Sequence, residues 1–287
     1  MVILKPMRWW FALLAATSWA ESYSIEPQRP VQGQVLKVFA PPQAGSARLN
    51  GKTIRLFPHS DGRSLGLMPI GVLTKPGRYT LEWLDGTGGP VHQEAITIAD
   101  AHFKKQNVTL SKALLKLHAT PDEREAIAAF LKNVSAVRYW QEPFVAPVAG
   151  CITSPFGVTR LHNGRPTGDY HAGLDQRGAF GSPVHAVAGG IVRIAQPFEL
   201  RGGTVALDHG QGLASIYLHL SRFAVKPGDE VKPGDVIGYV GSSGRSTGPH
   251  LHWTLYANGD PVNPLQWISL KPCPVQTPKR RAPRVSP

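Results

Sequence analysis

Five polar side chains on three short segments have the types and spacing to hold a metal ion and to transfer protons. They are His171 and Asp175 in H-A-G-L-D, His219 in Y-L-H-L-S, and His250 and His252 in G-P-H-L-H-W. Zinc hydrolases use three protein ligands and keep a fourth position for water, whose pKa falls to about 7. The set supplies three ligands and two further imidazoles, so it predicts an active site and not only a metal site.

Each segment is expected to be a β-strand that presents its polar residues on one face. In H-A-G-L-D the glycines in and around the segment argue against a helix. A strand would place His171, Gly173 and Asp175 on one face, and the missing side chain of Gly173 would leave room for an ion. A lone H-x-x-x-D pattern is weak, because it also arises by chance.

The segment around His250 and His252 carries a stronger signal. A period of two sets these imidazoles on one face and apolar side chains, including Trp253, on the other. The Gly- and Ser-rich run 241–249 before it is expected to be a loop that walls a cleft. In the third segment, alternation predicts that Tyr217 and His219 share a face opposite Leu218. A single histidine on a strand is usually structural, so this segment alone gives His219 no role.

The remaining histidines are interpreted as structural or surface residues. His162 and His209 lie beside glycines in expected turns, and His185 lies in an apolar strand. His59 and His92 stand alone among N-terminal strands.

The first twenty residues have the pattern of a signal peptide. Lys5 and Arg8 precede an apolar run too short to span a membrane, and Ser18 and Ala20 suit cleavage after residue 20. The alternative is an uncleaved anchor, and no cysteine follows the run to carry a lipid. Export would place the chain in an oxidising compartment, where Cys151 and Cys273 could form a disulfide. The alternative is two separate small apolar residues.

The chain is strongly basic. It has 31 Lys and Arg against 19 Asp and Glu, a formal net charge of +12. Such a balance favours contact with polyanions. The charges are scattered outside the Pro-rich tail, and no motif with interleaved aromatics indicates nucleic-acid binding. We therefore expect a solvated basic surface.

The chain is expected to be mainly β, in three parts between the signal peptide (1–20) and a basic Pro-rich tail (271–287). Residues 21–100 alternate short apolar segments with turns, including a hairpin at Asn50–Gly51, and predict a small β-sandwich. Residues 101–145 predict a helical connector. Its helix opens at Thr120 and Pro121, and Ile127, Phe130, Leu131 and Val134 form its apolar stripe. Residues 146–270 are again β, with two near-copies of a Lys-Pro-Gly-Asp turn and strand, 226–231 and 232–237.

Region 150–270 closely resembles the lysostaphin-type, or LytM-domain, zinc peptidases that cut peptidoglycan peptides. The shared motifs, in order, are S-P-F-G at 154–157, H-A-G-L-D, G-S-P-V at 181–184, Y-L-H-L-S, the Lys-Pro-Gly-Asp repeat and G-x-S-G-x-S-T-G-P-H-L-H. The resemblance implies a duplicated-hairpin β-sandwich with its site in an open groove. The N-terminal part more weakly resembles an immunoglobulin-like accessory domain.

Matching the motifs residue by residue implies roles for all five side chains. His171, Asp175 and His252 would bind one zinc ion per chain, and His219 and His250 would be the catalytic imidazoles. Relatives with latent forms place a side chain from a preceding segment on the zinc, and here Asn107, Asn133 or His118 could do so. The alternatives for the preceding segment are a spacer and a docking domain for an envelope protein.

The sequence thus predicts a periplasmic or secreted peptidoglycan endopeptidase, without a stable membrane anchor, that cuts D-Ala to diaminopimelate cross-links. A cutter of glycine bridges is the less favoured specificity. The alternative from another class is a catalytically silent LytM-type regulator that activates a cell-wall amidase. Such regulators typically lose ligands and carry coiled coils, whereas this chain keeps all five residues. A biotin- or lipoyl-type carrier is disfavoured because no hairpin tip displays a lysine between hydrophobic residues.

Overall fold

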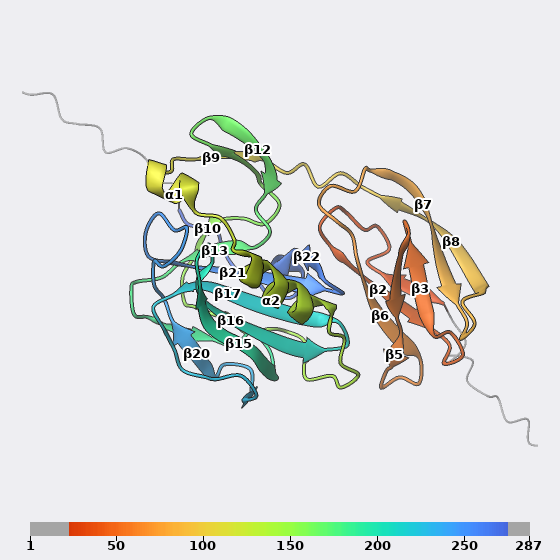
Figure 1. The fold of residues 1–287 in the computed structure, drawn as a ribbon. Helices are drawn as coiled ribbons and strands as arrows, with labels where there is room; N and C mark the ends of the chain where they lie inside the picture. The colour runs from red at the N-terminus through yellow and green to blue at the C-terminus, as the bar shows by residue number, and fades with distance from the viewer. Residues whose placement is uncertain (1–22, 275–287) are drawn as a thin grey trace, which may run out of the picture.

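Strands dominate the structure, a computed structural model that describes residues 23–274. The expected signal peptide and residues 275–287 of the expected tail lie outside the described residues. The described part is built mainly of antiparallel strands with short helices, which confirms a mainly β fold. Figure 1 shows two β-rich regions side by side, the N-terminal one in orange and the C-terminal one in green to blue.

The N-terminal region contains two four-stranded antiparallel sheets. In spatial order, one holds β1 (Ser24–Glu26), β2 (Val35–Ala40), β6 (Ser64–Pro69) and β5 (Phe57–Pro58). The other holds β4 (Lys52–Arg55), β3 (Ser46–Leu49), β7 (Gly77–Leu84) and β8 (Pro90–Ile98). The predicted hairpin is confirmed, since Asn50 and Gly51 join β3 to β4 with φ of 49° and 78°.

One apolar core fills the space between these two sheets. Leu36 and Val38 enter it from the first sheet, and Leu81 and Trp83 enter it from the second, all fully or nearly fully buried. Because the two sheets bury one shared core, the region is a small β-sandwich. Its likeness to an immunoglobulin domain stays a prediction.

The C-terminal region is organised around an eight-stranded antiparallel sheet. Its spatial order is β10 (Ile152–Ser154), β13 (Leu174–Arg177), β21 (His250–Ala257), β17 (Leu213–Leu220), β16 (Gly202–Gly210), β15 (Gly190–Phe198) and β19 (Glu230–Val231), and β22 (Asp260–Val262) pairs with β21. A second sheet holds β14 (Pro183–His185), β20 (Val236–Tyr239) and β18 (Arg222–Phe223). The 3-10 helix η2 (Pro264–Gln266) follows β22.

The two C-terminal sheets share a core, as the resemblance to a β-sandwich implied. Trp253 and Tyr217 of the large sheet and Ile237 of the small sheet are fully buried in one cluster. The repeated turns have matching geometry, because Asp229 and Asp235 each accept from the backbone N–H of the lysine three residues before. Cys151 and Cys273 form a disulfide, which was one of the two alternatives that the sequence allowed.

The segment expected to be a helical connector also contributes a strand. β9 (Lys105–Val108) pairs in parallel with β11 (Thr159–His162), which pairs in turn with β12 (Arg165–Tyr170). The short helix α1 (Lys112–Lys116) follows β9. The expected helical connector thus holds a strand as well as its helices, because the backbone of residues 105–108 is hydrogen-bonded to β11 of the C-terminal region.

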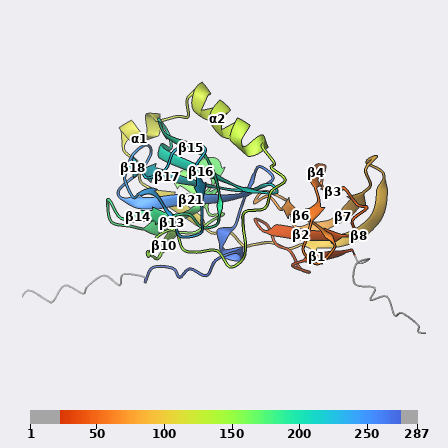
Figure 2. The same ribbon diagram turned by 90° about the horizontal axis from the view of Figure 1, so that it is seen from below.

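Helix α2 (Pro121–Lys132) begins as the sequence predicted, with the Thr120 hydroxyl accepting from the backbone N–H of Glu123. Ile127 and Phe130 bury their side chains against β15, β16 and β17. Figure 2 shows the helix lying across this face of the large sheet. Val134 was wrongly included in the apolar stripe, since it lies beyond the helix and is 36% exposed.

Hydrogen bonds and an ion pair join the N-terminal sandwich to the C-terminal region. The Gln266 amide accepts from the Val35 N–H and donates to the Val35 carbonyl. Lys52 forms an ion pair with Asp260 at 2.6 Å. Across residues 23–274, we find no helix with the length and apolar character needed to cross a membrane.

Candidate active site

The register of the large sheet brings Asp175 directly opposite His252. β13 and β21 are antiparallel neighbours, and the two residues are paired across them. Paired residues point to the same face of a sheet, so the carboxylate and the imidazole meet there. His250 lies on this face as well, two residues earlier on β21. The neighbouring residues Leu174 and Trp253 are fully buried on the opposite face.

Gly173 lies where the chain passes close to β21. A Cβ built at this position would lie 2.3 Å from the Trp253 carbonyl oxygen, 2.6 Å from the Thr254 hydroxyl and 2.8 Å from Nε2 of His252. The absent side chain therefore lets the chain pass close to β21 and leaves space for the His252 ring. The expectation that it also leaves room for an ion stays a prediction.

His171 lies just before β13 and is almost fully buried, with 5% of its surface exposed. Its Nδ1 is 2.8 Å from the carbonyl oxygen of Pro155. A carbonyl oxygen can only accept, so Nδ1 carries the proton and Nε2 carries the lone pair. The S-P-F-G segment thus fixes the imidazole in the form in which Nε2 can bind a metal.

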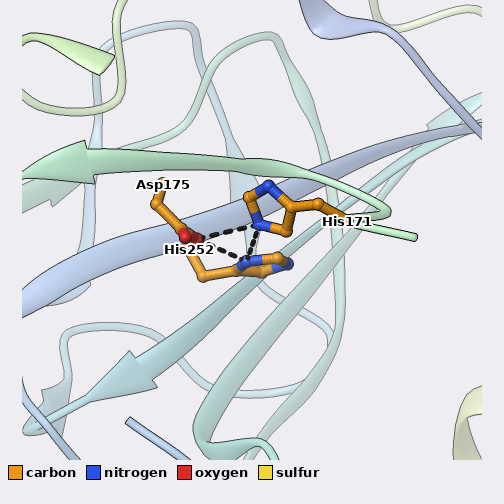
Figure 3. Close-up of side chains that lie close together, drawn as sticks. All are labelled: His171, Asp175 and His252. Atoms are coloured by element: carbon orange, nitrogen blue, oxygen red, sulfur yellow. Dashed lines mark hydrogen bonds and ion pairs between the residues drawn. The ribbon is translucent and has the colours of Figure 1, made fainter. Parts of the chain in front are cut away.

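Three candidate ligand atoms converge in this structure (Figure 3). Nε2 of His171 and Nδ1 of His252 lie 3.0 Å apart, and Oδ1 of Asp175 lies 3.0 Å and 2.8 Å from them. When both imidazoles are neutral and His252 carries its proton on Nε2, where the Thr254 hydroxyl lies 3.2 Å away, these three atoms are acceptors with no proton among them and repel one another unless a cation lies between them. Two imidazoles and one carboxylate are a donor set that zinc hydrolases use. The residues therefore fit a zinc ion.

The charge states suit this use. Burial raises the pKa of Asp175, but the nearby His171 and His252 outweigh it and bring the pKa well below the usual 3.8. Burial lowers the pKa of His252, in spite of the opposing effect of the Asp175 carboxylate. At neutral pH the carboxyl group is ionised and the His252 ring is neutral, which are the forms that coordinate metals.

His219 reaches the site by a route that strand alternation does not predict. Tyr217 and Leu218 are paired with Trp253 and His252, so Tyr217 faces the core and Leu218 faces the site. The expectation that His219 shares a face with Tyr217, opposite Leu218, was therefore wrong. Its φ of 62° lies in the left-handed region, where a non-glycine residue is strained, and the alternation ends there. The imidazole consequently lies on the site face, with its ring 6.1 Å from that of His252.

His219 and His250 form a pair of imidazoles beside the candidate ligands. Their ring centroids lie 5.0 Å apart. Nδ1 of His219 donates to the Ser243 carbonyl, and Nδ1 of His250 donates to the Gly248 carbonyl, both at 2.8 Å. Each neutral ring therefore carries its lone pair on Nε2. Burial, together with the charges of His252 and His250, lowers the pKa of His219 to about 3.

The five side chains lie in a cleft of about 500 Å³. The cleft is bounded by β11 and β12, by Val108 and Leu110 of the preceding segment, by the turn 200–201, and by Arg245 and Thr247 of the predicted loop. Sequence reasoning missed the three arginines of this cleft, Arg160, Arg201 and Arg245. The predicted ligands and proton-transfer residues are histidines and an aspartate. Apart from the basic composition, nothing in the sequence therefore indicates a role for these arginines.

Arg160 holds the second oxygen of the Asp175 carboxylate. Its Nη2 donates to Oδ2 of Asp175 at 3.2 Å and to the Ser154 hydroxyl at 3.3 Å. The Ser154 hydroxyl in turn donates to the Gln106 side chain of β9. The preceding segment therefore takes part in orienting the carboxylate.

The other predicted side chains lie elsewhere or keep structural roles. His209 is fully buried, and its nitrogens bond to the Gly189 carbonyl and the Ser215 hydroxyl. His162, interpreted as a turn residue, instead lies on β11 and lines the cleft. Asn107 accepts from the Gly164 N–H and Asn133 donates to Asp208, so neither occupies the candidate metal position.

Comparisons with known proteins agree on one family. Residues 169–264 match the sequence profile of peptidase family M23. The chain is 44% identical over 114 residues to the DD-carboxypeptidase/endopeptidase Mpg of Neisseria meningitidis, and 38% identical over 115 residues to the peptidoglycan DD-endopeptidase ShyA of Vibrio cholerae. Each alignment covers 40% of this chain and about a quarter of the relative, 26% and 27% respectively.

One solved structure is similar over most of its length. It is a Pseudomonas aeruginosa protein assigned to peptidase M23, 30% identical to this chain, with a TM-score of 0.61. The match covers 83% of this chain and 94% of that protein. The likeness therefore includes the N-terminal region as well as the region that carries the five side chains.

Proposed function

This chain belongs to peptidase family M23, and from that premise we propose that it is a zinc-dependent endopeptidase acting on the peptide cross-links of peptidoglycan. The observation that carries the proposal is the convergence of His171, Asp175 and His252 in an open cleft beside two further imidazoles. Peptidoglycan as the substrate is supported by the names of the relatives, a DD-carboxypeptidase/endopeptidase and a peptidoglycan DD-endopeptidase.

His171, Asp175 and His252 would hold one zinc ion through Nε2, Oδ1 and Nδ1. Bound there, zinc would supply Lewis-acid activation of water and of the scissile carbonyl. The protein fixes these three atoms through partners behind them. Pro155 holds the His171 ring, Arg160 holds the far oxygen of Asp175, and the Thr254 hydroxyl lies 3.2 Å from Nε2 of His252. Such outer partners fix ring orientation and tautomer.

His219 and His250 would handle the protons of the hydrolysis. Each neutral ring offers a lone pair at Nε2, because Nδ1 is committed to a backbone carbonyl. One ring can accept the proton of the attacking water, and as an imidazolium it can stabilise the oxyanion or protonate the departing amine. The backbone acceptors keep both rings oriented during this exchange.

The proposed bond is that between D-Ala and diaminopimelate in cross-linked stem peptides, with the protein exported to the periplasm or beyond. The N-terminal pattern of a signal peptide and the disulfide between Cys151 and Cys273 support export. The alternative of a silent regulator of an amidase is less favoured, because all five residues are retained and lie together.

The proposal is tested by incubating the purified, zinc-loaded chain with cross-linked sacculi and separating the released muropeptides. We expect dimers to disappear and monomers to appear, and we expect His250→Ala to prevent this. Cross-linked pentapeptides in the same assay report any loss of terminal D-Ala, which would reveal carboxypeptidase activity. Unchanged dimers in the presence of zinc-loaded wild-type protein would refute the proposed endopeptidase.

A further inference from the structure

The cleft carries an excess of positive charge that the proposed hydrolysis does not use. Three guanidinium groups line it, those of Arg160, Arg201 and Arg245, whereas its acidic residues are Asp169 and the candidate ligand Asp175. Two of the three arginines have counterions. Arg160 contacts Asp175 at 3.2 Å, and Arg201 contacts Glu123 at 2.6 Å.

Arg245 is the exception. Its guanidinium makes no hydrogen bond or ion pair with any side chain between residues 23 and 274, although the residue is partly buried. Burial lowers its pKa, the charges of Arg160 and Arg201 act in the same direction, and Asp169 opposes them. A partly desolvated cation beside two others is costly unless an anion joins it.

The position of Arg245 is fixed by the backbone around it. Its N–H donates to the Leu200 carbonyl, and the Leu200 N–H donates to Glu123, which also holds Arg201. Glu123 is fully buried on α2, so this helix anchors the turn that carries Arg201 and, through Leu200, the loop that carries Arg245. The guanidinium therefore belongs to a built wall of the cleft.

The same wall supports the proposed proton-transfer machinery. The Ser243 carbonyl, two residues before Arg245, accepts from Nδ1 of His219. The Arg201 carbonyl accepts from the His219 N–H. Because Arg245 and His219 line the same cleft, an anion held by Arg245 would lie in the cleft that receives the bond to be cut.

We infer that Arg245 is a specificity-determining residue that binds a free carboxylate of the peptide substrate next to the scissile amide. The inference rests on the proposed function, because cross-linked stem peptides carry carboxylates on diaminopimelate and on the terminal D-Ala. Guanidinium groups match carboxylates with two parallel hydrogen bonds, and such a contact both binds and orients. Arg201, kept in place by Glu123, adds to the positive potential at this site.

The test compares wild-type protein with Arg245→Gln, Arg245→Lys and the control Arg165→Gln. Arg165 is exposed at the hairpin between β11 and β12 and does not line the cleft, so its replacement changes net charge by the same amount. The substrates are a cross-linked stem-peptide dimer and forms of it in which one carboxylate at a time is converted to the amide. The amide that proves to be a poor substrate shows whether diaminopimelate or the terminal D-Ala supplies the carboxylate that Arg245 binds.

For wild type and Arg165→Gln, we expect one amide to lower kcat/KM by about 10- to 100-fold. Arg245→Gln should lose a similar factor on the free acid and should no longer distinguish the acid from that amide. For Arg245→Lys, we expect both kcat/KM on the free acid and the preference for the acid over the amide to lie between those of wild type and Arg245→Gln. If Arg245→Gln keeps the wild-type preference, or if no amide affects the wild type, the inference is wrong.

Binding separates this inference from the proposed function. The peptide product, as free acid and as amide, is titrated into zinc-loaded wild type and Arg245→Gln, with circular dichroism and zinc content confirming that the variant folds. Tighter binding of the acid by wild type alone supports the carboxylate site even if no dimer is cleaved. Equal binding of acid and amide by the wild type would overturn it.

Discussion

The two β-rich regions use their sheets differently. In the N-terminal sandwich the two sheets turn toward each other, and residues such as Leu81 and Trp83 fill the space between them. In the C-terminal region one face of the large sheet buries Tyr217 and Trp253, while the other face is divided. Helix α2 covers the part over β15 to β17, and the cleft occupies the part where β13 and β21 meet.

The histidines follow the same division. In the N-terminal sandwich His59 lies beside Asp61, and His92 stacks on Tyr23 with the ring centroids 4.2 Å apart. Neither has a second imidazole nearby among the residues described. On the open face of the C-terminal sheet, paired strands bring several imidazoles and a carboxylate together. A sheet face that the core does not need is what allows polar side chains to converge.

The first prediction tests whether the clustered side chains of the C-terminal sheet bind metal and the lone histidines of the N-terminal sandwich do not. His171→Ala, Asp175→Ala and His252→Ala should each reduce bound zinc from one per chain to none and abolish sacculus cleavage, because zinc needs all three ligands. The matched control is His92→Ala, which should keep both the bound zinc and the cleavage of sacculi. Elemental analysis and muropeptide separation give the two readouts. A ligand variant that retains stoichiometric zinc would show that its residue is wrongly assigned.

The second prediction separates the imidazoles that flank the ligands. His219→Asn and His250→Ala should keep zinc but lose about 10²- to 10⁴-fold in kcat, as is typical for loss of a general acid or base. Asparagine is chosen at position 219 because it tolerates the left-handed backbone there. Zinc content is measured beside turnover of a soluble dimer. Parallel loss of metal and activity would mean that the residue acts as a ligand.

The third prediction concerns the histidine that lies inside the core. Burial lowers the pKa of His209 from 6.5 to about 4, against smaller effects of the Gly189 carbonyl and Asp208. As pH falls below 6.5 the unfolded chain takes up this proton first. The free energy of unfolding should therefore fall by about 1.4 kcal/mol per pH unit, or about 3 kcal/mol by pH 4.

Denaturant unfolding of wild type and His209→Gln across this pH range provides the measurement. The variant should show a slope shallower by that amount, because glutamine does not titrate. Equal slopes would contradict a neutral, buried His209.

The fourth prediction compares a glycine from each region. Gly173→Ala should destabilise the chain by about 2 kcal/mol and weaken zinc binding, because the new Cβ would press on the Trp253 carbonyl and the His252 ring. At Gly45 of the N-terminal sandwich a Cβ would meet nothing within 4 Å, so Gly45→Ala should change stability by less than about 0.5 kcal/mol. Chemical denaturation and zinc titration measure the pair. Similar costs at both sites would show that the close approach at Gly173 is not specific.

Local sequence patterns predicted much of the fold. The N-terminal strands, the Asn50–Gly51 hairpin, the capped start of α2 and the repeated Lys-Pro-Gly-Asp turns depend on backbone preferences and alternation within a few residues. The strand at the start of the connector was harder to predict. β9 exists because its backbone pairs with β11, some fifty residues later in the chain, and nothing within β9 itself indicates that partner.

For the site, the sequence by itself determined which residue types are available and placed His250 and His252 on one strand face, because alternation is a local property of the backbone. Only the tertiary structure decided that Asp175 lies opposite His252, since register depends on how two distant strands pair. It also decided that His219 joins them, through a left-handed residue that reverses the expected face. The tertiary structure alone also decided where the charges of the cleft arginines lie, because the packing of α2 and two loops, rather than any local motif, sets their positions.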